Sequence, residues 1–210
     1  MKKILIVVDY EGDFASKNGK LYVKDGDTLS HNIQDRIDDK DYEDIIYTFD
    51  THTEEEYFGS EEQKQFPNIH CEYKTEGWKL YKIKPINNMN FSKFVDNTDK
   101  PFEMVNFGKE FFFTKNKFDI WTGNKVYEEW FTNRYDKNEV IVEVVGLAQN
   151  YCVFMNIIGL VKHGYKVNMI KECVKGIRNF PDGTIDDSFL KNNTVMRDKN
   201  VNFITYKEWV

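Results

Sequence analysis

The sequence predicts an α/β domain in which helices cover both faces of a mostly parallel sheet. Short apolar runs recur along the chain, and segments with helical periodicity lie between them. Continuous apolar runs are typical of parallel strands buried on both faces, and their alternation with helices is the pattern of βαβ units. At 210 residues, without a repeat or a Pro/Gly-rich linker, the chain is expected to form one domain over residues 1–210.

Five apolar runs are predicted as strands, and they are Ile4–Val8, Ile45–Phe49, Phe111–Thr114, Val140–Val145 and Val167–Ile170. A weaker run, "VNFITY" from Val201, is predicted as the sixth. The first run follows "MKK" and so resembles the start of a signal peptide. Acidic residues follow after only about five apolar ones, fewer than the roughly 7–15 of a signal peptide's apolar core. We therefore interpret it as a buried strand and expect a cytoplasmic protein.

Helical patterns separate these runs. Ser30 is predicted to cap "HNIQDRIDDK", and Asn150 is predicted to cap "YCVFMNIIGLVKHG", with Gly164 ending that helix. "DDSFLKNN", residues 186–193, is predicted as a short helix. Residues 79–108 form a long connection for such a fold. Their aromatic content suits either a lid or a contact between subunits of a homo-oligomer.

Composition excludes several classes of function. The chain carries 29 Lys and Arg against 35 Asp and Glu, a net charge of −6, which argues against nucleic-acid or acidic-membrane binding. No apolar run approaches the roughly 20 residues that span a bilayer. Three cysteines without regular spacing indicate neither a disulfide framework nor a cysteine metal knuckle.

Residues with reactive side chains follow the predicted strands. Sheets of this type place their chemistry beyond the carboxyl ends of the strands. Asp9 follows the first strand, "DTH" from Asp50 follows the second, Lys115 follows the third, and "GLAQNYC", which ends at Cys152, follows the fourth. A carboxylate, a potential metal ligand pair, a lysine and a thiol at strand ends together favour an enzyme.

Cys152 has two interpretations. A single cysteine after an apolar strand is more often an inert core residue. At the first turn of a helix, however, the free N–H groups favour a thiolate and can hold the oxyanion of an acyl intermediate. Asp9 either caps the following loop or exchanges a proton with the thiol. Lys115 would hold Asp9 and favour the thiolate, although Lys117 is a rival, and Phe14 is placed to line the same crevice.

The loop of residues 50–71 carries candidate metal ligands. Asp50 and His52 can point the same way from an extended segment, and His70 lies in the same loop. Two imidazoles and a carboxylate suit Zn, Fe or Mn. The alternative is an acidic surface loop with incidental histidines. Spacing does not select a fourth ligand among the nearby glutamates, which are Glu54, Glu55, Glu56, Glu61, Glu62 and Glu72.

Four segments in order resemble the nicotinamidases of the isochorismatase-like cysteine hydrolase superfamily. "VVDYEGDF" resembles the family's D-x-Q-N-D-F strand, and "FDTH" with "FPNIHC" resembles its metal segment. "KNKFDIW" resembles its lysine motif, and "GLAQNYCV" resembles its cysteine motif. The resemblance implies a three-layer α/β/α fold with a six-stranded, mostly parallel sheet. It also selects Lys115 over Lys117.

The resemblance assigns further roles. It implies a catalytic triad of Asp9, Lys115 and Cys152, and an oxyanion hole from the N–H groups of Ala148 and Cys152 beside a cis bond between Leu147 and Ala148. It adds Glu62, with Glu61 as the alternative, to the metal ligands Asp50, His52 and His70. It places Phe14, Phe66, Tyr151 and Trp121 around the substrate ring. The sequence departs from the family at Glu11-Gly12, Asp119-Ile120 and Gln149-Asn150, which changes the rim of the pocket.

The implied activity is hydrolysis of nicotinamide to nicotinate and ammonia through a cysteine thioester, in NAD salvage. One divalent ion, with Zn expected before Fe or Mn, would bind the pyridine nitrogen. The expected partner is a small-molecule amide, with no nucleic acid and no membrane. Two alternatives remain: a related hydrolase acting on another small amide, ureide or enol ether, and a non-catalytic member that binds a small pyridine or a partner protein.

Overall fold

The computed structural model describes residues 1–177 and 199–204. Its strands are β1 (Lys2–Val8), β2 (Tyr42–Asp50), β3 (Met104–Phe107), β4 (Glu110–Lys115), β5 (Val140–Leu147), β6 (Lys166–Lys175) and β7 (Val201–Ile204). Its helices are α1 (Gly12–Ala15), the 3₁₀ turn η1 (Gly26–Thr28), α2 (Ser30–Ile37), α3 (Glu54–Tyr57), α4 (Glu61–Gln65), α5 (Asn88–Asp96), α6 (Ile120–Gly123), α7 (Tyr127–Arg134) and α8 (Cys152–Lys162). The helix predicted at residues 186–193 lies outside the described residues.

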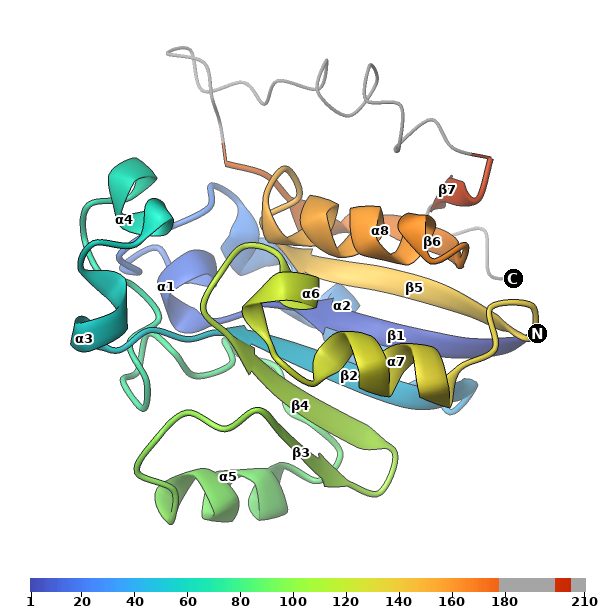
Figure 1. Cartoon of the computed structure of the whole chain (residues 1–210), viewed down its shortest axis with the longest axis horizontal. Coiled ribbons are helices and arrows are strands. Elements are labelled where there is room, and N and C mark those ends of the chain that lie inside the picture. Colours follow the sequence, from blue (N-terminus) through green and yellow to red (C-terminus); the bar gives the residue numbers. More distant parts are fainter. Residues whose placement is uncertain (178–198, 205–210) are drawn as a thin grey trace.

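The strands form one sheet in the order β3-β4-β2-β1-β5-β6-β7 (Figure 1). Every neighbouring pair is parallel except β3 and β4, which are antiparallel. The predicted α/β class and its mostly parallel sheet are confirmed. The predicted number of six strands is wrong, because β3 and the turn at Gly108 (φ +64°) add a hairpin at the sheet edge.

The sheet separates two cores, which makes the fold three-layered. Alternate side chains of β1 point to opposite faces, as the period of a strand requires. Ile4 and Ile6 pack in the core beneath α6, α7 and α8, whereas Leu5 and Val7 pack in the core beneath α2 and α5. Figure 1 shows α6, α7 and α8 on the near face of the sheet.

Residues 79–108 contain α5 and β3 rather than an irregular connection. Phe91 of α5 is buried and stacks on Phe112 of β4, with ring centroids 4.1 Å apart. This helix therefore belongs to the layer that covers one face of the sheet. Its role as a lid or subunit contact stays a prediction.

Two predicted helix caps are wrong. Ser30 is the first residue of α2, which follows Leu29, and α8 follows Tyr151 rather than Asn150. The Asn150 side chain instead pairs with the backbone of Ile177, whose N–H donates to its Oδ1 and whose carbonyl accepts from its Nδ2. Gly164 has φ +84° just after α8, so the predicted helix end is confirmed.

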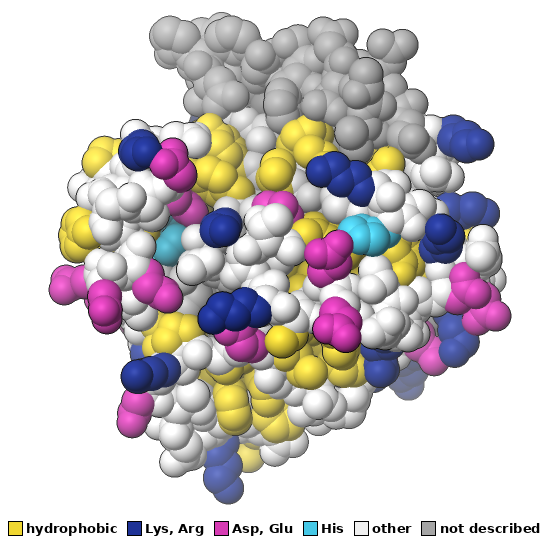
Figure 2. Space-filling model, viewed as in Figure 1, with side chains coloured by type: hydrophobic (Ala, Val, Ile, Leu, Met, Phe, Trp, Pro, Cys, Tyr) yellow, Lys and Arg dark blue, Asp and Glu magenta, His cyan; other side chains and the backbone are white. Residues whose placement is uncertain are grey.

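The distribution of charged side chains on the surface is consistent with the small net charge of −6. In the view of Figure 2 acidic and basic side chains are interspersed, with no continuous field of one sign. Among the described helices none is both long enough and apolar enough to cross a bilayer.

A buried carboxyl group in β5 predicts a pH-dependent stability. Glu143 is fully buried, accepts a hydrogen bond from the Tyr42 hydroxyl, and has its pKa raised by burial. A pKa raised by folding means that the native state binds the proton more tightly, so this contribution to stability falls as pH rises above the unfolded value of 4.5. We expect the Glu143→Gln variant to lose that dependence, so that its free energy of unfolding improves relative to wild type between pH 4.5 and neutrality.

Urea unfolding across this pH range measures the effect. The exposed Glu43→Gln variant serves as the control, since its side chain is half exposed and pairs with Lys2 at the surface. A difference between wild type and Glu143→Gln that stays constant with pH would contradict the prediction.

Candidate active site

The predicted catalytic side chains lie at one edge of the sheet. Because β1, β2, β4 and β5 are parallel, their carboxyl ends meet beside α1, α3 and α4 (Figure 1). Asp9 follows β1, Lys115 ends β4, and Cys152 begins α8 after β5. All three are buried, which removes water from the groups that would react.

Lys115 joins the thiol to two carboxylates. Its Nζ lies 2.8 Å from Asp9 Oδ2, 3.0 Å from Asp50 Oδ1 and 3.6 Å from Cys152 Sγ. Asp9 also accepts a hydrogen bond of 2.6 Å from the Thr48 hydroxyl. The ammonium therefore fixes both the carboxylate and the sulfur. The rival Lys117 is exposed, so the structure brings Lys115 and not Lys117 into the group.

The electrostatics of this group favour a thiol at rest. Burial raises the pKa of Cys152 well above its usual value, and the nearby Lys115 lowers it only in part. Lys115 therefore favours the thiolate as expected, but burial opposes it and has the larger effect on the pKa of Cys152. Burial also raises the pKa of Asp9, although Lys115 opposes the shift. A carboxylate with a raised pKa is a stronger base, as proton transfer from the thiol requires.

Four potential metal ligands converge beside this group. The ligand atoms of Asp50, His52, Glu62 and His70 all lie within 4.8 Å of one another, and all four residues are buried. His70 Nε2 is 3.4 Å from Asp50 Oδ2 and 3.2 Å from Glu62 Oε1, and His52 Nε2 is 3.2 Å and 3.8 Å from the same atoms. A tetrahedral ion with bonds of about 2.0–2.2 Å would separate its ligands by about 3.4 Å. The spacing therefore fits one metal ion.

The charges of this group also fit a cation. Burial alone would lower the pKa of His52, but Asp50 and Glu62 outweigh it and raise the pKa to about 10. The same balance raises the pKa of His70 to about 9. The two carboxylates thus stabilise positive charge at the imidazole nitrogens, either as protons or as a divalent ion.

Glu62 rather than Glu61 belongs to this group. Glu62 is buried, whereas the Glu61 side chain is 87% exposed and pairs with Lys64. Both lie in the first turn of α4, whose N-cap Ser60 accepts from the Gln63 N–H. The helix therefore turns one of two adjacent glutamates inward.

Supporting residues orient the metal group. The Tyr57 hydroxyl lies 3.3 Å from Nδ1 of His70, which leaves Nε2 facing the other ligands. Asp50 directs Oδ2 toward the histidines and Oδ1 toward Lys115. This carboxylate therefore links the candidate metal ligands, called the metal group (Asp50, His52, Glu62 and His70), to the catalytic group (Asp9, Lys115 and Cys152). Lys115 and His52 hold the pKa of Asp50 well below its usual range, although burial alone would raise it.

Glu11 is a buried acid that sequence reasoning treated only as a departure from the family motif. Its Oε2 accepts the Asp50 N–H at 2.8 Å, and its side chain is fully buried. Burial, with the neighbouring Asp9 and Asp50, raises its pKa well above the usual range. A carboxyl group has nearly the size and shape of the glutamine in the motif, and the raised pKa favours its neutral form, which is closer to glutamine in charge.

Aromatic rings surround the histidines. Phe14 and Phe66 both meet His70 edge to face, with centroids 5.4 Å and 6.0 Å apart. Phe66 also packs on Tyr151 and on Phe118, which pack on each other. Sequence reasoning did not select Phe118. It lies within "KNKFDIW", in the aromatic position of that motif, so the motif itself carried the signal.

Trp121 does not join this aromatic group. Its ring stacks on His163 and packs on Tyr127 and Phe131 beneath α8. Its indole N–H donates to the carbonyl of Asn156. The structure therefore places Trp121 in the core, since α6 turns its side chain back toward α8, and does not bring it to the rings around His70.

The expected cis bond between Leu147 and Ala148 is present. Among the described residues, the N–H groups of Ala148 and Cys152 have no protein acceptor, whereas the N–H groups of Tyr151 and Val153 both donate to the Ala148 carbonyl. These two donors, one of them on Cys152 itself, have no acceptor among the described residues and are available to an oxyanion.

Comparisons with known proteins show which chains and folds this protein is similar to. No family model matches the chain. The nicotinamidase of Saccharomyces cerevisiae is 27% identical over 201 residues, which cover 86% of this chain and 91% of that protein. The pyrazinamidase of Pyrococcus horikoshii in complex with zinc superposes with a TM-score of 0.68 at 21% identity, covering 98% of this chain and all of that one. PnC1 of L. infantum in complex with nicotinate superposes with a TM-score of 0.70 at 17% identity, covering 98% and 93%.

The chain therefore has the isochorismatase-like hydrolase fold. Within that fold it is similar to the nicotinamidases and pyrazinamidases, which are amidohydrolases, and the resemblance predicted from four short motifs is confirmed.

Proposed function

We propose that the chain is a metal-dependent cysteine amidohydrolase that converts nicotinamide to nicotinate and ammonia. The observation that carries the proposal is the double role of Asp50, which pairs with Lys115 of the catalytic group and with both histidines of the metal group. A thiol, a base and a metal group in contact suit a pyridine ring that bears a carboxamide. The similarity to a nicotinamidase supports this substrate.

In the proposed reaction Asp9 accepts the thiol proton while Cys152 Sγ bonds to the carboxamide carbon. The N–H groups of Ala148 and Cys152 bind the oxyanion. Asp9 then returns the proton to the amide nitrogen, the C–N bond breaks, and ammonia leaves. Water next gives a proton to Asp9 and attacks the thioester, which releases nicotinate and restores the thiol. Throughout the reaction the Lys115 ammonium contacts both Asp9 and Cys152 and keeps them close together.

Asp50, His52, Glu62 and His70 would hold the metal ion. When bound, the ion supplies a Lewis acid for the pyridine nitrogen, which orients the ring and withdraws electron density from it. Phe14, Phe66, Phe118 and Tyr151 would pack on the ring and exclude water. Zinc suits two imidazoles and two carboxylates, and zinc is present in the similar pyrazinamidase. We further expect the activity to serve NAD salvage in the cytoplasm.

Ammonia release from nicotinamide by the zinc-loaded protein tests the function. Pyrazinamide retains a ring nitrogen in the same position and should also be hydrolysed, whereas benzamide lacks it and should react far more slowly. Turnover of other small amides or ureides without turnover of nicotinamide would favour the related-hydrolase alternative, since the pocket rim departs from the family motif. Binding of nicotinamide without ammonia release would favour the non-catalytic alternative.

Removing a metal ligand should abolish metal retention and activity together. We expect His70→Ala to lower zinc affinity by well over the roughly 10–100-fold that loss of an outer residue costs. Elemental analysis after dialysis measures zinc per chain, and the ammonia assay follows activity. His31→Ala is the control, because that side chain is 85% exposed on α2. Equal zinc content in wild type and His70→Ala would contradict the proposed ligand set.

A further inference from the structure

A cavity of about 530 Å³ lies between the loop of residues 74–84, helix α5 and strand β2. Its volume falls within the roughly 300–1,000 Å³ of small-molecule sites. It combines an apolar aromatic wall with a rim of lysines. We propose that this cavity binds a small aromatic anion of the size of a purine mononucleotide, with the ring against the wall and the phosphate at the rim.

The apolar wall is already in place without a ligand. Phe49 of β2 packs on both Trp78 and Phe91, with ring centroids 5.0 Å and 5.4 Å apart. The Trp78 indole N–H donates to the Thr51 hydroxyl at 2.9 Å, which fixes the ring. Leu80 also lines the cavity and is partly exposed. Phe49, Trp78 and Phe91 are 0%, 2% and 6% exposed, so a bound ring would contact Leu80 and the small surface that Trp78 and Phe91 leave open. Because this wall is fixed before binding, it lowers the ordering cost of binding a flat ring.

The rim concentrates positive charge on an acidic protein. Four lysines and one carboxylate, that of Asp96, line the cavity, in a chain whose net charge is −6. Lys79 pairs with Glu76, and Lys74 Nζ lies 3.8 Å from Asp99. The other two lysines remain available for an anion.

These two lysines are Lys82 and Lys84. Both are exposed, and within residues 1–177 and 199–204 neither forms an ion pair with a carboxylate. Lys82 Nζ lies 4.9 Å from the centroid of the Tyr81 ring, a contact that leaves its N–H donors open to an anion. The backbone of Lys84 is fixed, since its N–H donates to Gln34 Oε1 and its carbonyl accepts from Gln34 Nε2.

The loop holds its lysines in an unusual backbone conformation. Lys74 and Lys82 have φ +67° and +54°, in the left-handed region that side chains other than those of Gly, Asn and Asp seldom adopt. Two lysines held in this region of one short loop indicate that the surrounding contacts determine where their side chains begin. The backbone of the loop is therefore held at Lys74 and Lys82, while the side chains of Lys82 and Lys84 are exposed to solvent.

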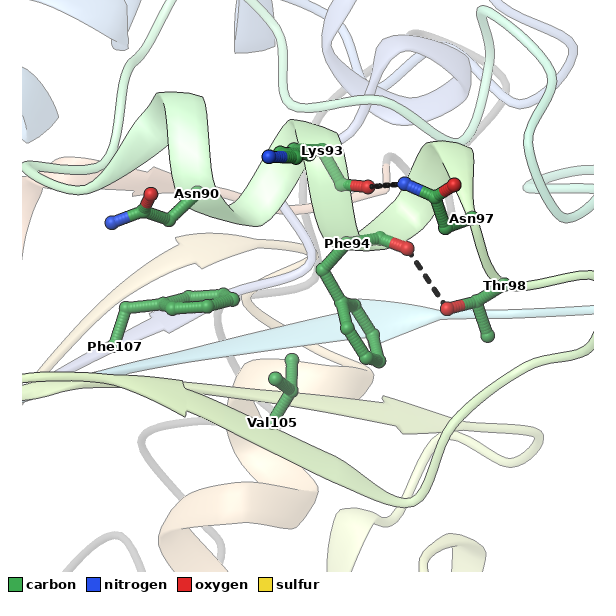
Figure 3. Close-up of a pocket in the computed structure, with 7 residues that line it drawn as sticks. All are labelled: Asn90, Lys93, Phe94, Asn97, Thr98, Val105 and Phe107. Atoms are coloured by element: carbon green, nitrogen blue, oxygen red, sulfur yellow. Dashed lines mark hydrogen bonds between the residues drawn. The ribbon is translucent and has the colours of Figure 1, made fainter.

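The opposite face of α5 provides a contrast. A cavity of about 480 Å³ lies there between α5 and β3, over Phe94, Val105 and Phe107 (Figure 3). A single lysine, Lys93, lines this cavity. The Thr98 hydroxyl beside it already donates to the Phe94 carbonyl in the last turn of α5 (Figure 3), so it is not free to bind a ligand. This second face has apolar surface without a cationic rim, so Lys93 supplies a matched control.

The experiment measures binding of AMP to the zinc-loaded protein by isothermal titration calorimetry. We expect AMP to bind at sub-millimolar concentration, and adenosine and inorganic phosphate each to bind about tenfold more weakly, since each retains only one of the two recognised groups. We expect Lys82→Gln/Lys84→Gln to weaken AMP binding about tenfold, because two exposed charge contacts are lost while the aliphatic stems are kept. Lys93→Gln should bind AMP as wild type does.

Other results would overturn the proposal. Absence of AMP binding at millimolar concentration would exclude the site, and equal affinity in the double variant and Lys93→Gln would place AMP elsewhere. Adenosine binding as tightly as AMP would remove the role of the lysine rim. None of these results depends on amide hydrolysis, so they are separate from the test of the proposed function.

Discussion

Replacing Cys152 with alanine is expected to lower ammonia release from nicotinamide by about ten-thousand-fold or more, as loss of a nucleophile does in other covalent hydrolases. Sγ lies 3.6 Å from Lys115 Nζ at the start of α8, a contact that neither Cys71 nor Cys173 makes. The variant has no atom that can form the thioester. Zinc content should be unchanged, because Cys152 is not among the four candidate metal ligands.

The matched control is Cys173→Ala. Cys173 is equally buried and unpaired, but it lies in β6 within the core that α2 covers. Its loss should lower stability without lowering the rate per folded molecule. Wild-type turnover by Cys152→Ala would reject covalent catalysis by this residue, and an equal loss in both variants would indicate that the effect comes from folding.

The strands were predictable because their burial is continuous. Ile4–Val8 of β1, Ile45–Phe49 of β2 and most of β5 are apolar and buried, and strands buried on both faces carry that signal in any sequence. β3 escaped prediction because three of its four residues are only partly buried and one is exposed, which leaves no continuous apolar run. Its position depends instead on the turn at Gly108 and on pairing with β4, which are tertiary properties.

Residue types at strand ends indicated the candidate site, but the pKa values of its side chains could not be predicted from the sequence. The motif positions of Asp9, Lys115 and Cys152 follow from strand ends, and the structure brings these side chains together. The raised pKa of the Cys152 thiol does not follow from the sequence, because it depends on burial that only the packed fold produces. The choice of Glu62 over Glu61 likewise depends on which face of α4 turns inward.

The double role of Asp50 connects the two halves of the site. One carboxylate oxygen of Asp50 accepts a hydrogen bond from Lys115, while the other faces both histidines. A positive charge bound at the histidines would therefore affect the Lys115 ammonium through Asp50. A variant that removes a carboxylate from the catalytic group should therefore leave Asp50, and with it the metal group, intact. This separation makes Asp9 the residue at which proton transfer can be tested alone.

Asp9→Asn is expected to lower kcat for nicotinamide by about 10²–10⁴-fold, the usual contribution of a positioned acid–base group. An amide is nearly the same size and can still accept a hydrogen bond from the Thr48 hydroxyl, which lies 2.6 Å from Asp9 Oδ1. It cannot accept the Cys152 proton or return it to the leaving amine. Lys115 keeps Asp50 as its partner at 3.0 Å, so the ammonium remains paired and zinc content should match wild type.

Asp44→Asn controls for the loss of a buried, ion-paired carboxylate. Asp44 is buried near the start of β2, and its Oδ2 accepts from Arg134 Nε and from the Tyr135 hydroxyl, each at 2.8 Å. This variant should lose stability but retain kcat, because it lies at the end of the strand opposite the catalytic group. Equal losses of kcat in Asp9→Asn and Asp44→Asn would show that Asp9 contributes to folding and not to proton transfer. An unchanged kcat in Asp9→Asn would exclude Asp9 as the group that transfers the proton, since no atom of the new side chain can carry it.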